Sequence, residues 1–160
     1  MLFRSRGLLR EVYGVADERV DVIPHGIPDV AFADPNAHKN RFGLDGDHVL
    51  LTFGLLSPSK GIEQVIRALP EVVARHPATR YVVLGATHPN LVREQGEAYR
   101  EGLARLAAEL GVERHVVFHD RFVDMQELTG FLGAADIYVT PYLNEDQITS
   151  GTLAYAFGCG

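Results

Sequence analysis

Cysteine is nearly absent from this chain, because Cys159 is the only one among its 160 residues. A single cysteine excludes a disulfide within the chain, so we expect a reducing, cytoplasmic location. We also expect Cys159 to be a buried, inert thiol rather than a nucleophile. No arrangement of residues resembles a serine or cysteine catalytic triad.

Long apolar runs are absent too. None approaches the roughly 18 residues of a transmembrane helix, and the first residues, MLFRSRG, lack the apolar middle of a signal peptide. We expect no transmembrane segment, while peripheral attachment of the whole protein to a membrane stays open. The first residues resemble the interior of a helix, and residues 150–160 resemble the start of another, so both ends are expected to be cut.

Clustered positive charge is the third feature that the sequence lacks. Its 15 basic residues are scattered, and 21 acidic residues give a net charge of −6. Nucleic acid is therefore not expected as a partner, because phosphate backbones are held by basic patches. A metal site is not expected either, since His115 and His119 lie on a predicted strand, where four residues span about 13 Å.

Four short apolar runs are present, as expected for strands that are covered on both faces: residues 48–53, 80–84, 115–119 and 136–140. Helices are predicted between and after them, at 61–76, 90–111, 124–132 and from residue 150. Pro70 should kink or divide the first helix, and the second should begin at Asn90 and end at Gly111. This alternation predicts an α/β fold with a Rossmann-like parallel sheet flanked by helices.

The first 47 residues are less regular. A short helix at 8–13 is expected to end at Gly14, and an alternating stretch at 19–23 is typical of a strand. Residues 28–47 are rich in proline, aspartate and glycine and are typical of a linker. Lys39 lies in this linker, outside the candidate ligand loops, so its substitution is expected to leave ligand binding unchanged.

The loop after the first predicted strand is a candidate ligand site, because ligands of open α/β sheets bind at the carboxyl ends of the strands. It reads GLLSPSKG from Gly54 to Gly61. Its glycines let backbone approach a ligand, and Lys60 precedes a helix N-terminus that can hold an anion. The glycine spacing fits neither a Walker loop nor a dinucleotide fingerprint, and an ordinary turn with a surface lysine is the alternative.

The second candidate is the loop that leads into the last helix, residues 144–152. Thr149, Ser150 and Gly151 expose backbone N–H groups where that helix starts, and the acidic residues before them can bind hydroxyls. The alternative is a helix cap that follows a solvated acidic loop.

Three segments together resemble the retaining glycosyltransferases of family 4, which have two Rossmann-like lobes. VDVIPHGI at 20–27 is similar to the hinge motif, and FGLLSPSKG at 53–61 is similar to the loop that holds the donor. AADIYVTP at 134–141 is similar to the strand that enters the family's glutamate motif. Their order and spacing match over nearly the whole chain, so the set is specific although each segment alone is not.

The resemblance implies three parts of the chain: residues 1–33 from the preceding lobe and hinge, a linker at 34–47, and a donor-binding lobe at 48–160 that is incomplete at its C-terminal end. It implies retaining transfer of a hexose from a nucleoside diphosphate sugar, with no cofactor and an unidentified acceptor. The acceptor site and a catalytic histidine of such enzymes lie in the other lobe, so we expect this chain alone to be inactive.

The same resemblance assigns roles to residues. Lys60 matches the lysine that meets the donor diphosphate, and Gly54 matches the glycine that lets the donor approach. The segment 121–123 matches the one beside the base, and the backbone of residues 149–152 matches the part that touches sugar and phosphate. The predicted donor-binding residues are Gly54, Ser57, Lys60, Gly85, Arg121, Phe122, Val123, Thr149, Ser150, Gly151, Thr152 and Tyr155.

Three positions depart from the family pattern. Leu55 stands where the family has an arginine, which removes one partner of the diphosphate charge. Gln147 and Tyr155 stand at the two glutamates, of which the first normally contacts the transferred sugar and the second the ribose. Glu145 is the nearest remaining carboxylate, so Glu145 and Gln147 are the predicted catalytic residues.

Two alternatives to a transferase stay open. Leu55, Gln147 and Tyr155 favour a lobe that retains the nucleotide sugar but has lost transfer. A sugar-nucleotide epimerase of the same architecture is the other, although no histidine or acidic pair is placed for proton abstraction. In each case, exposed apolar surface is expected along the last helix and near residues 1–27, where absent elements would cover it.

Overall fold

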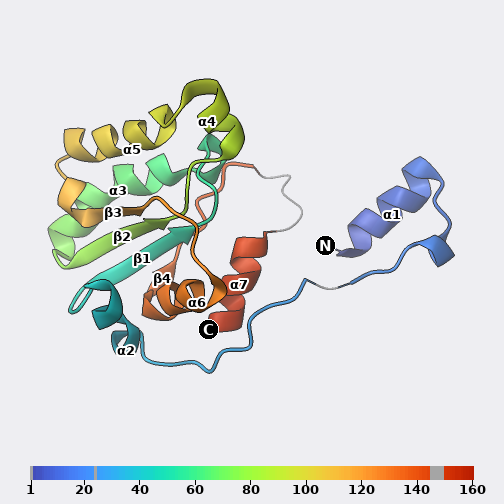
Figure 1. Ribbon diagram of the computed structural model, residues 1–160, viewed down its shortest axis with the longest axis horizontal. Helices are drawn as coiled ribbons and strands as arrows, with labels where there is room; N and C mark the ends of the chain where they lie inside the picture. The colour runs from blue at the N-terminus through green and yellow to red at the C-terminus, as the bar shows by residue number, and fades with distance from the viewer. Residues whose placement is uncertain (1, 24, 145–149) are drawn as a thin grey trace.

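The structure is a computed structural model that describes residues 2–23, 25–144 and 150–160 (Figure 1). Its centre is a four-stranded sheet in the order β3-β2-β1-β4. The strands are β1 (His48–Phe53), β2 (Thr79–Leu84), β3 (Val116–His119) and β4 (Ile137–Tyr138). Every neighbouring pair is parallel, so the predicted α/β fold with a parallel sheet is confirmed.

The central strands β1 and β2 pair along their whole length. Their side chains are buried on both faces of the sheet, and Leu51, Tyr81, Val82 and Val83 are 0% exposed. This explains the continuous apolar runs in the sequence, because neither face of a central strand meets water.

β4 is shorter than the run predicted at 136–140. Its inner edge pairs with β1, and the pairing extends past the strand because Val139 N donates to Leu51 O at 2.8 Å. Its outer edge has no neighbouring strand among the described residues, and Ile137 is exposed. Regular pairing in β4 is confined to Ile137 and Tyr138.

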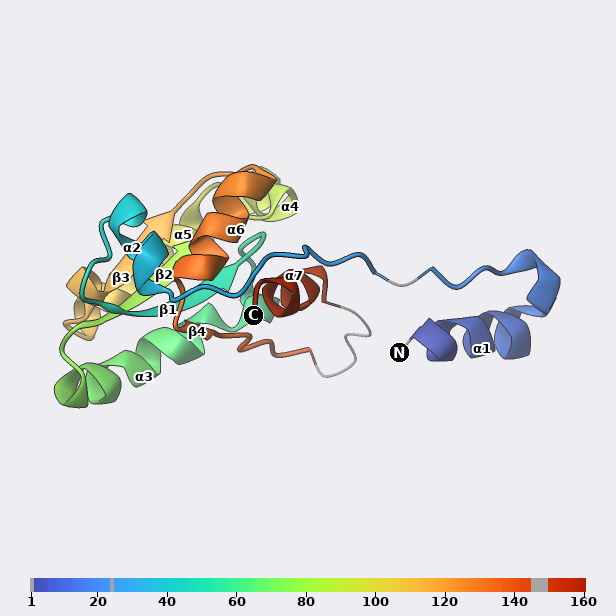
Figure 2. The same cartoon turned by 90° about the horizontal axis from the view of Figure 1, so that it is seen from below.

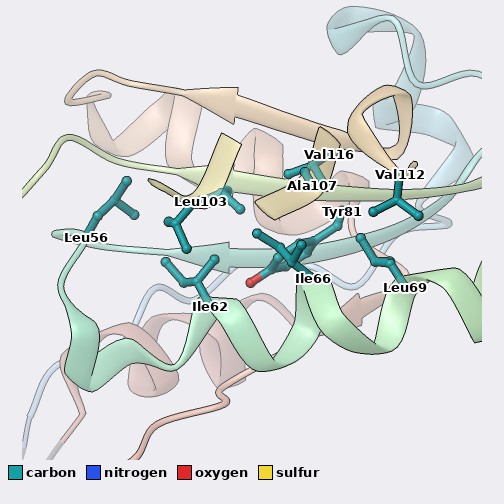
Figure 3. Close-up of a cluster of buried hydrophobic side chains, with 10 residues drawn as sticks. Leu56, Ile62, Ile66, Leu69, Tyr81, Leu103, Ala107, Val112 and Val116 are labelled. Atoms are coloured by element: carbon teal, nitrogen blue, oxygen red, sulfur yellow. The ribbon is translucent and has the colours of Figure 1, made fainter. Parts of the chain in front are cut away.

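One face of the sheet is covered by α3 (Ile62–Arg75) and α5 (Ala98–Glu109). Their apolar sides meet side chains of β2 and β3 in one buried cluster (Figure 3). Apolar burial of this kind is the main favourable contribution to folding. The cluster consists of Leu56, Ile62, Ile66, Leu69, Tyr81, Val83, Leu103, Ala107, Val112 and Val116.

The other face is covered by three helices: α2 (Asn36–Lys39), α6 (Met125–Ala134) and α7 (Gly151–Cys159) (Figure 2). A 3-10 turn, Asn40–Phe42, follows α2 and brings Phe42 onto Phe131 of α6, with ring centroids 3.9 Å apart. A Cβ atom at Gly130 would lie 3.1 Å from the Phe42 ring, so this glycine permits the close approach. Part of the predicted linker is therefore packed against the lobe.

The long helix predicted at 90–111 is two helices, α4 (Pro89–Gln95) and α5. Gly96 separates them with φ 61°, a left-handed conformation that ends a helix. The predicted cap is also wrong, because Asn90 N donates to His88 Nδ1 at 3.2 Å and His88 caps α4. The predicted end is confirmed, since Gly111, with φ 69°, follows α5.

Pro70 does not divide α3, which runs unbroken from Ile62 to Arg75. A proline inside a helix removes one backbone hydrogen bond and crowds the preceding turn. Here Ile66 and Leu69, just before it, are fully buried. Packing on the sheet therefore holds the helix together across the proline.

Residues 19–23 do not form the predicted strand. The chain makes a 3-10 turn at Asp17–Arg19 and then runs without regular pairing. No strand lies beside this segment in the part of the chain that the structure describes, and an alternating pattern needs a neighbouring strand to become a sheet. α1 (Leu2–Tyr13) precedes it and lies apart from the sheet (Figures 1 and 2).

Lys39 is a core residue rather than an exposed linker lysine, at 3% exposure. Its ammonium donates to the Asp136 carboxylate at 2.8 Å and to Asp47 O at 2.8 Å. Asp136 also accepts from Val49 N at 2.7 Å. This ion pair joins α2 to β1 and to the start of β4, so we expect substitution of Lys39 to lower stability, while its effect on ligand binding stays a prediction.

Exposed apolar side chains occur near residues 1–27, as predicted: Leu8, Leu9, Val12, Tyr13, Ile23 and Ile27. On α7, where an apolar surface along the helix was predicted, Phe157 is the one large apolar side chain that is exposed, at 74%. Other exposed apolar side chains, such as Phe122 and Ile137, lie outside both places, so the prediction is confirmed only for the first segment. Among the described helices, none is both long enough and apolar enough to cross a membrane.

Cys159 lies at the end of α7 and is partly exposed, not buried as predicted. Its partial burial still raises the pKa of the thiol. A thiol with a raised pKa is protonated at neutral pH, and the thiolate is the reactive form. The expectation of an unreactive thiol is therefore consistent with its position.

Candidate functional site

The loops after the strands converge at the carboxyl edge of the sheet, where a ligand site was expected. Hydrogen bonding continues past the strands, because Gly54 N donates to Leu84 O and Gly85 N donates to His119 O, each at 2.9 Å. Gly54 and Gly85 consequently lie side by side beyond β1 and β2.

Neither glycine can be replaced without displacing its neighbours. Both have positive φ, 123° at Gly54 and 137° at Gly85, where other residues are strained. A Cβ atom at Gly85 would lie 2.2 Å from Gly54 O, and one at Gly54 would lie 3.1 Å from the Thr152 methyl carbon. Bare backbone therefore forms this part of the edge.

An apolar pocket of about 240 Å³ opens beside the two glycines. Arg121 is the one charged residue among those that line it in the described chain. A mostly apolar hollow with a few polar groups at its rim fits a flat ring system. Its lining consists of Phe53, Gly54, Leu55, Leu84, Gly85, Ala86, Arg121, Phe122, Val123 and Leu128.

Arg121 is held at the rim of this pocket by α6. Its guanidinium donates to both carboxylate oxygens of Glu127, one of them at 2.8 Å. The hydrogen bond from Arg121 lowers the pKa of Glu127. Asp124 starts α6 as predicted, accepting from Glu127 N at 2.8 Å, and thereby fixes the helix end that presents Glu127.

Lys60 occupies the other side of Gly54. It ends the 3-10 turn Pro58–Lys60, and Gly61, with φ 64°, then leads into α3. A Cβ atom at Gly54 would lie 3.5 Å from Lys60 Nζ, so the ammonium lies next to the bare backbone. In the same loop, the Ser57 hydroxyl lies 2.9 Å from that of Ser59.

The loop after β4 packs directly on the start of α3. Leu143 N donates to Ser59 O at 3.0 Å, and a Cβ atom at Gly61 would lie 2.0 Å from Pro141 O. This packing brings Tyr142 to Lys60. The ammonium donates to the Tyr142 hydroxyl at 3.0 Å and lies 4.2 Å from the centre of the tyrosine ring.

The start of α7 completes the same hollow. Thr152 Oγ1 lies 2.5 Å from the Tyr142 hydroxyl and 3.0 Å from Ser150 Oγ. Ser150 caps the helix by accepting from Leu153 N at 3.2 Å. Gly54, Lys60, Tyr142 and Thr152 thus surround one point, although they come from three separate segments.

The pKa values of the two tyrosines near this point, Tyr142 and Tyr138, are shifted in opposite directions. Burial tends to raise the pKa of Tyr142, but its hydrogen bonds with Thr152 and Lys60 outweigh burial and lower the pKa overall. Burial raises the pKa of Tyr138, on β4. The Tyr142 hydroxyl therefore lies in a field that favours its ionised form.

Sequence reasoning named the carboxyl end of the fourth strand but did not include Tyr142 among the site residues. The signal was its position directly after that strand. Its contact with Lys60 depends on how the loops pack, which the spacing of residues does not reveal.

Tyr155 lies on α7 and packs against the buried cluster on that face of the sheet. Its ring meets the ring of His25 edge to face, with centroids 6.0 Å apart. The two residues line a second hollow of about 370 Å³ with Met125 and the segment 26–28. Thr149 and the predicted catalytic Glu145 and Gln147 lie outside the described residues.

The two histidines considered as metal ligands have other partners. His115 Nδ1 is 2.9 Å from Thr79 O. His119 packs against the Phe131 ring, and burial together with Arg121 lowers its pKa. No three His, Cys, Asp or Glu side chains come together as a metal site in the described parts of the chain, and the absence of a metal stays a prediction.

Comparison with known proteins identifies the family. The model of the family described as Glycosyl transferases group 1 matches residues 34–147. The chain belongs to this glycosyltransferase family. The match includes the 54–61 loop and the 141–143 loop, so Gly54, Lys60 and Tyr142 lie inside the matched region, whereas Ser150 and Thr152 lie beyond it.

Relatives of known name are similar over most of this chain. A GDP-mannose-dependent alpha-(1-6)-phosphatidylinositol monomannoside mannosyltransferase of Mycolicibacterium smegmatis is 36% identical over 123 residues, 74% of this chain and 29% of that protein. A D-inositol 3-phosphate glycosyltransferase of Acidothermus cellulolyticus is 31% identical over 144 residues, 86% of this chain and 31% of that protein. The chain therefore spans less than a third of either relative.

A solved structure supports the same assignment at the level of the fold. Anabaena HepE in complex with UDP matches 97% of this chain and 40% of its own, with a TM-score of 0.71 and 20% identity. The chain is thus a C-terminal glycosyltransferase lobe with the Rossmann-like architecture of the GT-B fold.

Proposed function

We propose that this lobe binds a nucleoside diphosphate sugar and that the whole protein transfers the hexose, with retention, to an acceptor. The observation that carries the proposal is the junction at the carboxyl edge. Three features meet there. The apolar pocket suits the base of the nucleotide, and the bare glycine backbone lets the diphosphate approach. The Lys60 ammonium suits the negative charge of the diphosphate.

The related proteins support a donor of this class. One relative is named as GDP-mannose-dependent, and structures of Anabaena HepE contain UDP and UDP-glucose. The base of the donor would occupy the pocket lined by residues 121–123, and its diphosphate would lie across Gly54 toward Lys60.

Lys60 and the start of α7 would act on the leaving group. Cleavage of the sugar–phosphate bond leaves negative charge on the diphosphate, and preorganised cations and N–H groups stabilise such charge. The N-terminus of α7 has the favourable dipole direction for that role. Glu145 and Gln147 remain our proposed catalytic residues, and Tyr155 our proposed ribose contact.

The second candidate function is a binding module, a lobe that still binds the nucleotide sugar but belongs to a protein that no longer transfers it. Leu55 favours it, because Leu55 lines the pocket as an apolar residue where related enzymes have a cation. Tyr155 also favours it, because a hydroxyl stands where the resemblance implies a ribose-binding carboxylate.

Two measurements test the proposal. Calorimetry of this chain with UDP, GDP and ADP should give weak binding of at least one, and the chain alone should show no transfer of labelled sugar. Transfer by the whole protein separates the enzyme from the degenerate binding module. Absence of binding by all three nucleotides would refute the proposed donor site.

A further inference from the structure

Three hydroxyl groups connect Lys60 to the backbone of α7 in one continuous line. Lys60 Nζ is 3.0 Å from the Tyr142 hydroxyl, which is 2.5 Å from Thr152 Oγ1. Thr152 Oγ1 is 3.0 Å from Ser150 Oγ, which accepts from Leu153 N. The line joins the loop after β1, the loop after β4 and the start of α7.

The chemistry of the end groups gives this line a direction. An ammonium group can only donate, so the Tyr142 oxygen accepts from Lys60 and its proton is available to Thr152. Thr152 then donates to Ser150, whose oxygen already accepts from a backbone N–H. In this direction Tyr142 and Thr152 each both accept and donate, and a cation at the head of such a series strengthens every donor after it.

We propose that Tyr142 is a positioning residue of the donor site: its hydroxyl holds the Lys60 ammonium beside Gly54 and, through Thr152, makes Ser150 a stronger hydrogen-bond donor toward the diphosphate. The proposal rests on the proposed donor function. It adds to that function a reason why one lysine serves without the arginine that Leu55 replaces.

The loop does not need the Tyr142 hydroxyl to keep its place. Leu143 N donates to Ser59 O, and Pro141 packs on Gly61. Phenylalanine at 142 would also keep the ring that lies 4.2 Å from Lys60 Nζ. Tyr142→Phe therefore removes the hydrogen bonds and leaves the loop and the ring contact.

A double-mutant cycle tests whether Tyr142 acts through Lys60. The wild type, Tyr142→Phe, Lys60→Ala and the double variant are titrated with UDP and GDP by calorimetry. Tyr142→Phe should weaken the binding of whichever nucleotide binds by about three- to tenfold, the size expected for one ordinary hydrogen bond, because Tyr142 acts on the nucleotide through Lys60. In the Lys60→Ala background it should change binding by less than about twofold.

Tyr13→Phe is the matched control, because Tyr13 is an exposed tyrosine on α1. It should leave the affinity unchanged. Equal losses from Tyr142→Phe in the presence and absence of Lys60 would overturn the positioning role, and so would no loss in either background.

A second readout needs no nucleotide. Ionised tyrosine is followed by near-ultraviolet absorbance as the pH rises, and Tyr142 should ionise below the ordinary value of about 10. In the part of the chain that the structure describes, the groups that face it are Lys60, Thr152, Ser150 and Tyr138. The absorbance change from the ionisation of Tyr142 should vanish in Tyr142→Phe and should occur at higher pH in Lys60→Ala.

The two readouts separate the two proposals. No nucleotide binding by the wild type overturns the donor function and the positioning role with it, even when the ionisation of Tyr142 shifts as expected. In another outcome, Lys60→Ala weakens nucleotide binding but leaves the pH at which Tyr142 ionises unchanged. This result supports the donor function and overturns the role of Tyr142.

Discussion

At the residue scale, the candidate site depends on positions where a side chain is missing as much as on those where one is present. Gly54 and Gly85 leave backbone bare at the edge of the sheet, and Lys60 supplies the charge beside it. The glycines and the lysine lead to separate predictions. Substitution of a glycine should cause a steric clash and backbone strain, whereas substitution of Lys60 should remove a positive charge.

Lys60→Ala should weaken nucleoside diphosphate binding about tenfold or more, since a charge-assisted hydrogen bond contributes roughly 1.5–3 kcal/mol. Arg75→Ala is the control: it removes the same charge from the far end of α3, where Arg75 is 73% exposed. Both are measured by calorimetry at one salt concentration, because exposed charges are screened. Equal losses would indicate non-specific attraction.

Gly85→Ala should destabilise the fold by clash, not only by strain. A Cβ atom there would lie 2.2 Å from Gly54 O, whereas one at Gly46, which also has positive φ, would meet nothing within 4 Å. Gly46→Ala should therefore cost about 1 kcal/mol, typical of a left-handed non-glycine residue, and Gly85→Ala clearly more. Urea unfolding of the two variants makes the comparison, and equal losses would contradict the predicted clash.

At the element scale, the Lys39–Asp136 pair connects the segment before the sheet to two of its strands. Its members are 97 positions apart, and the Lys39 side chain is 4% exposed. An uncompensated charge at such a place is unfavourable, so the pair decides whether α2 stays on the sheet.

Lys39→Met should lower the free energy of unfolding by about 3 kcal/mol, the lower end for a broken buried pair, because the Asp136 side chain is 31% exposed. Adding Asp136→Asn should recover part of the loss, since it removes the unpaired charge and keeps an acceptor for Val49 N. Arg75→Ala, which breaks an exposed pair with Glu71, should change little. A loss from Lys39→Met no larger than that of Arg75→Ala would mean that the pair is not needed.

At the scale of the whole molecule, large apolar side chains remain exposed, among them several near the N-terminal helix and one on α7. Tyr13 is 70%, Ile23 79% and Phe157 74% exposed. Exposed apolar surface favours contact with another surface.

The isolated chain should therefore associate as its concentration rises. Sedimentation velocity over a range of concentrations measures this, and the triple variant Val12→Ser, Ile23→Ser and Phe157→Ser should associate less than the wild type. These three side chains are exposed, so their replacement should leave the sheet and its clusters intact. A wild type that stays monomeric at high concentration would contradict the prediction.

The sequence by itself determined the type of fold and the edge at which a ligand would bind. Runs such as 48–53 and 80–84 are apolar because both faces of a central strand are buried, and this local signal is independent of the partners. The loop at 54–61 follows the first run directly, so its place at the carboxyl edge follows from the order of elements alone.

The tertiary structure decided what depends on neighbours. The stretch 19–23 has the pattern of a strand but no partner, and Pro70 stays inside a helix because packing holds it. Lys39 is in a polar segment, and only its distant partner Asp136 explains its burial. Tyr142 is likewise one tyrosine in a loop until three segments pack together and bring its hydroxyl between Lys60 and Thr152, because contacts between residues far apart in sequence arise only from packing.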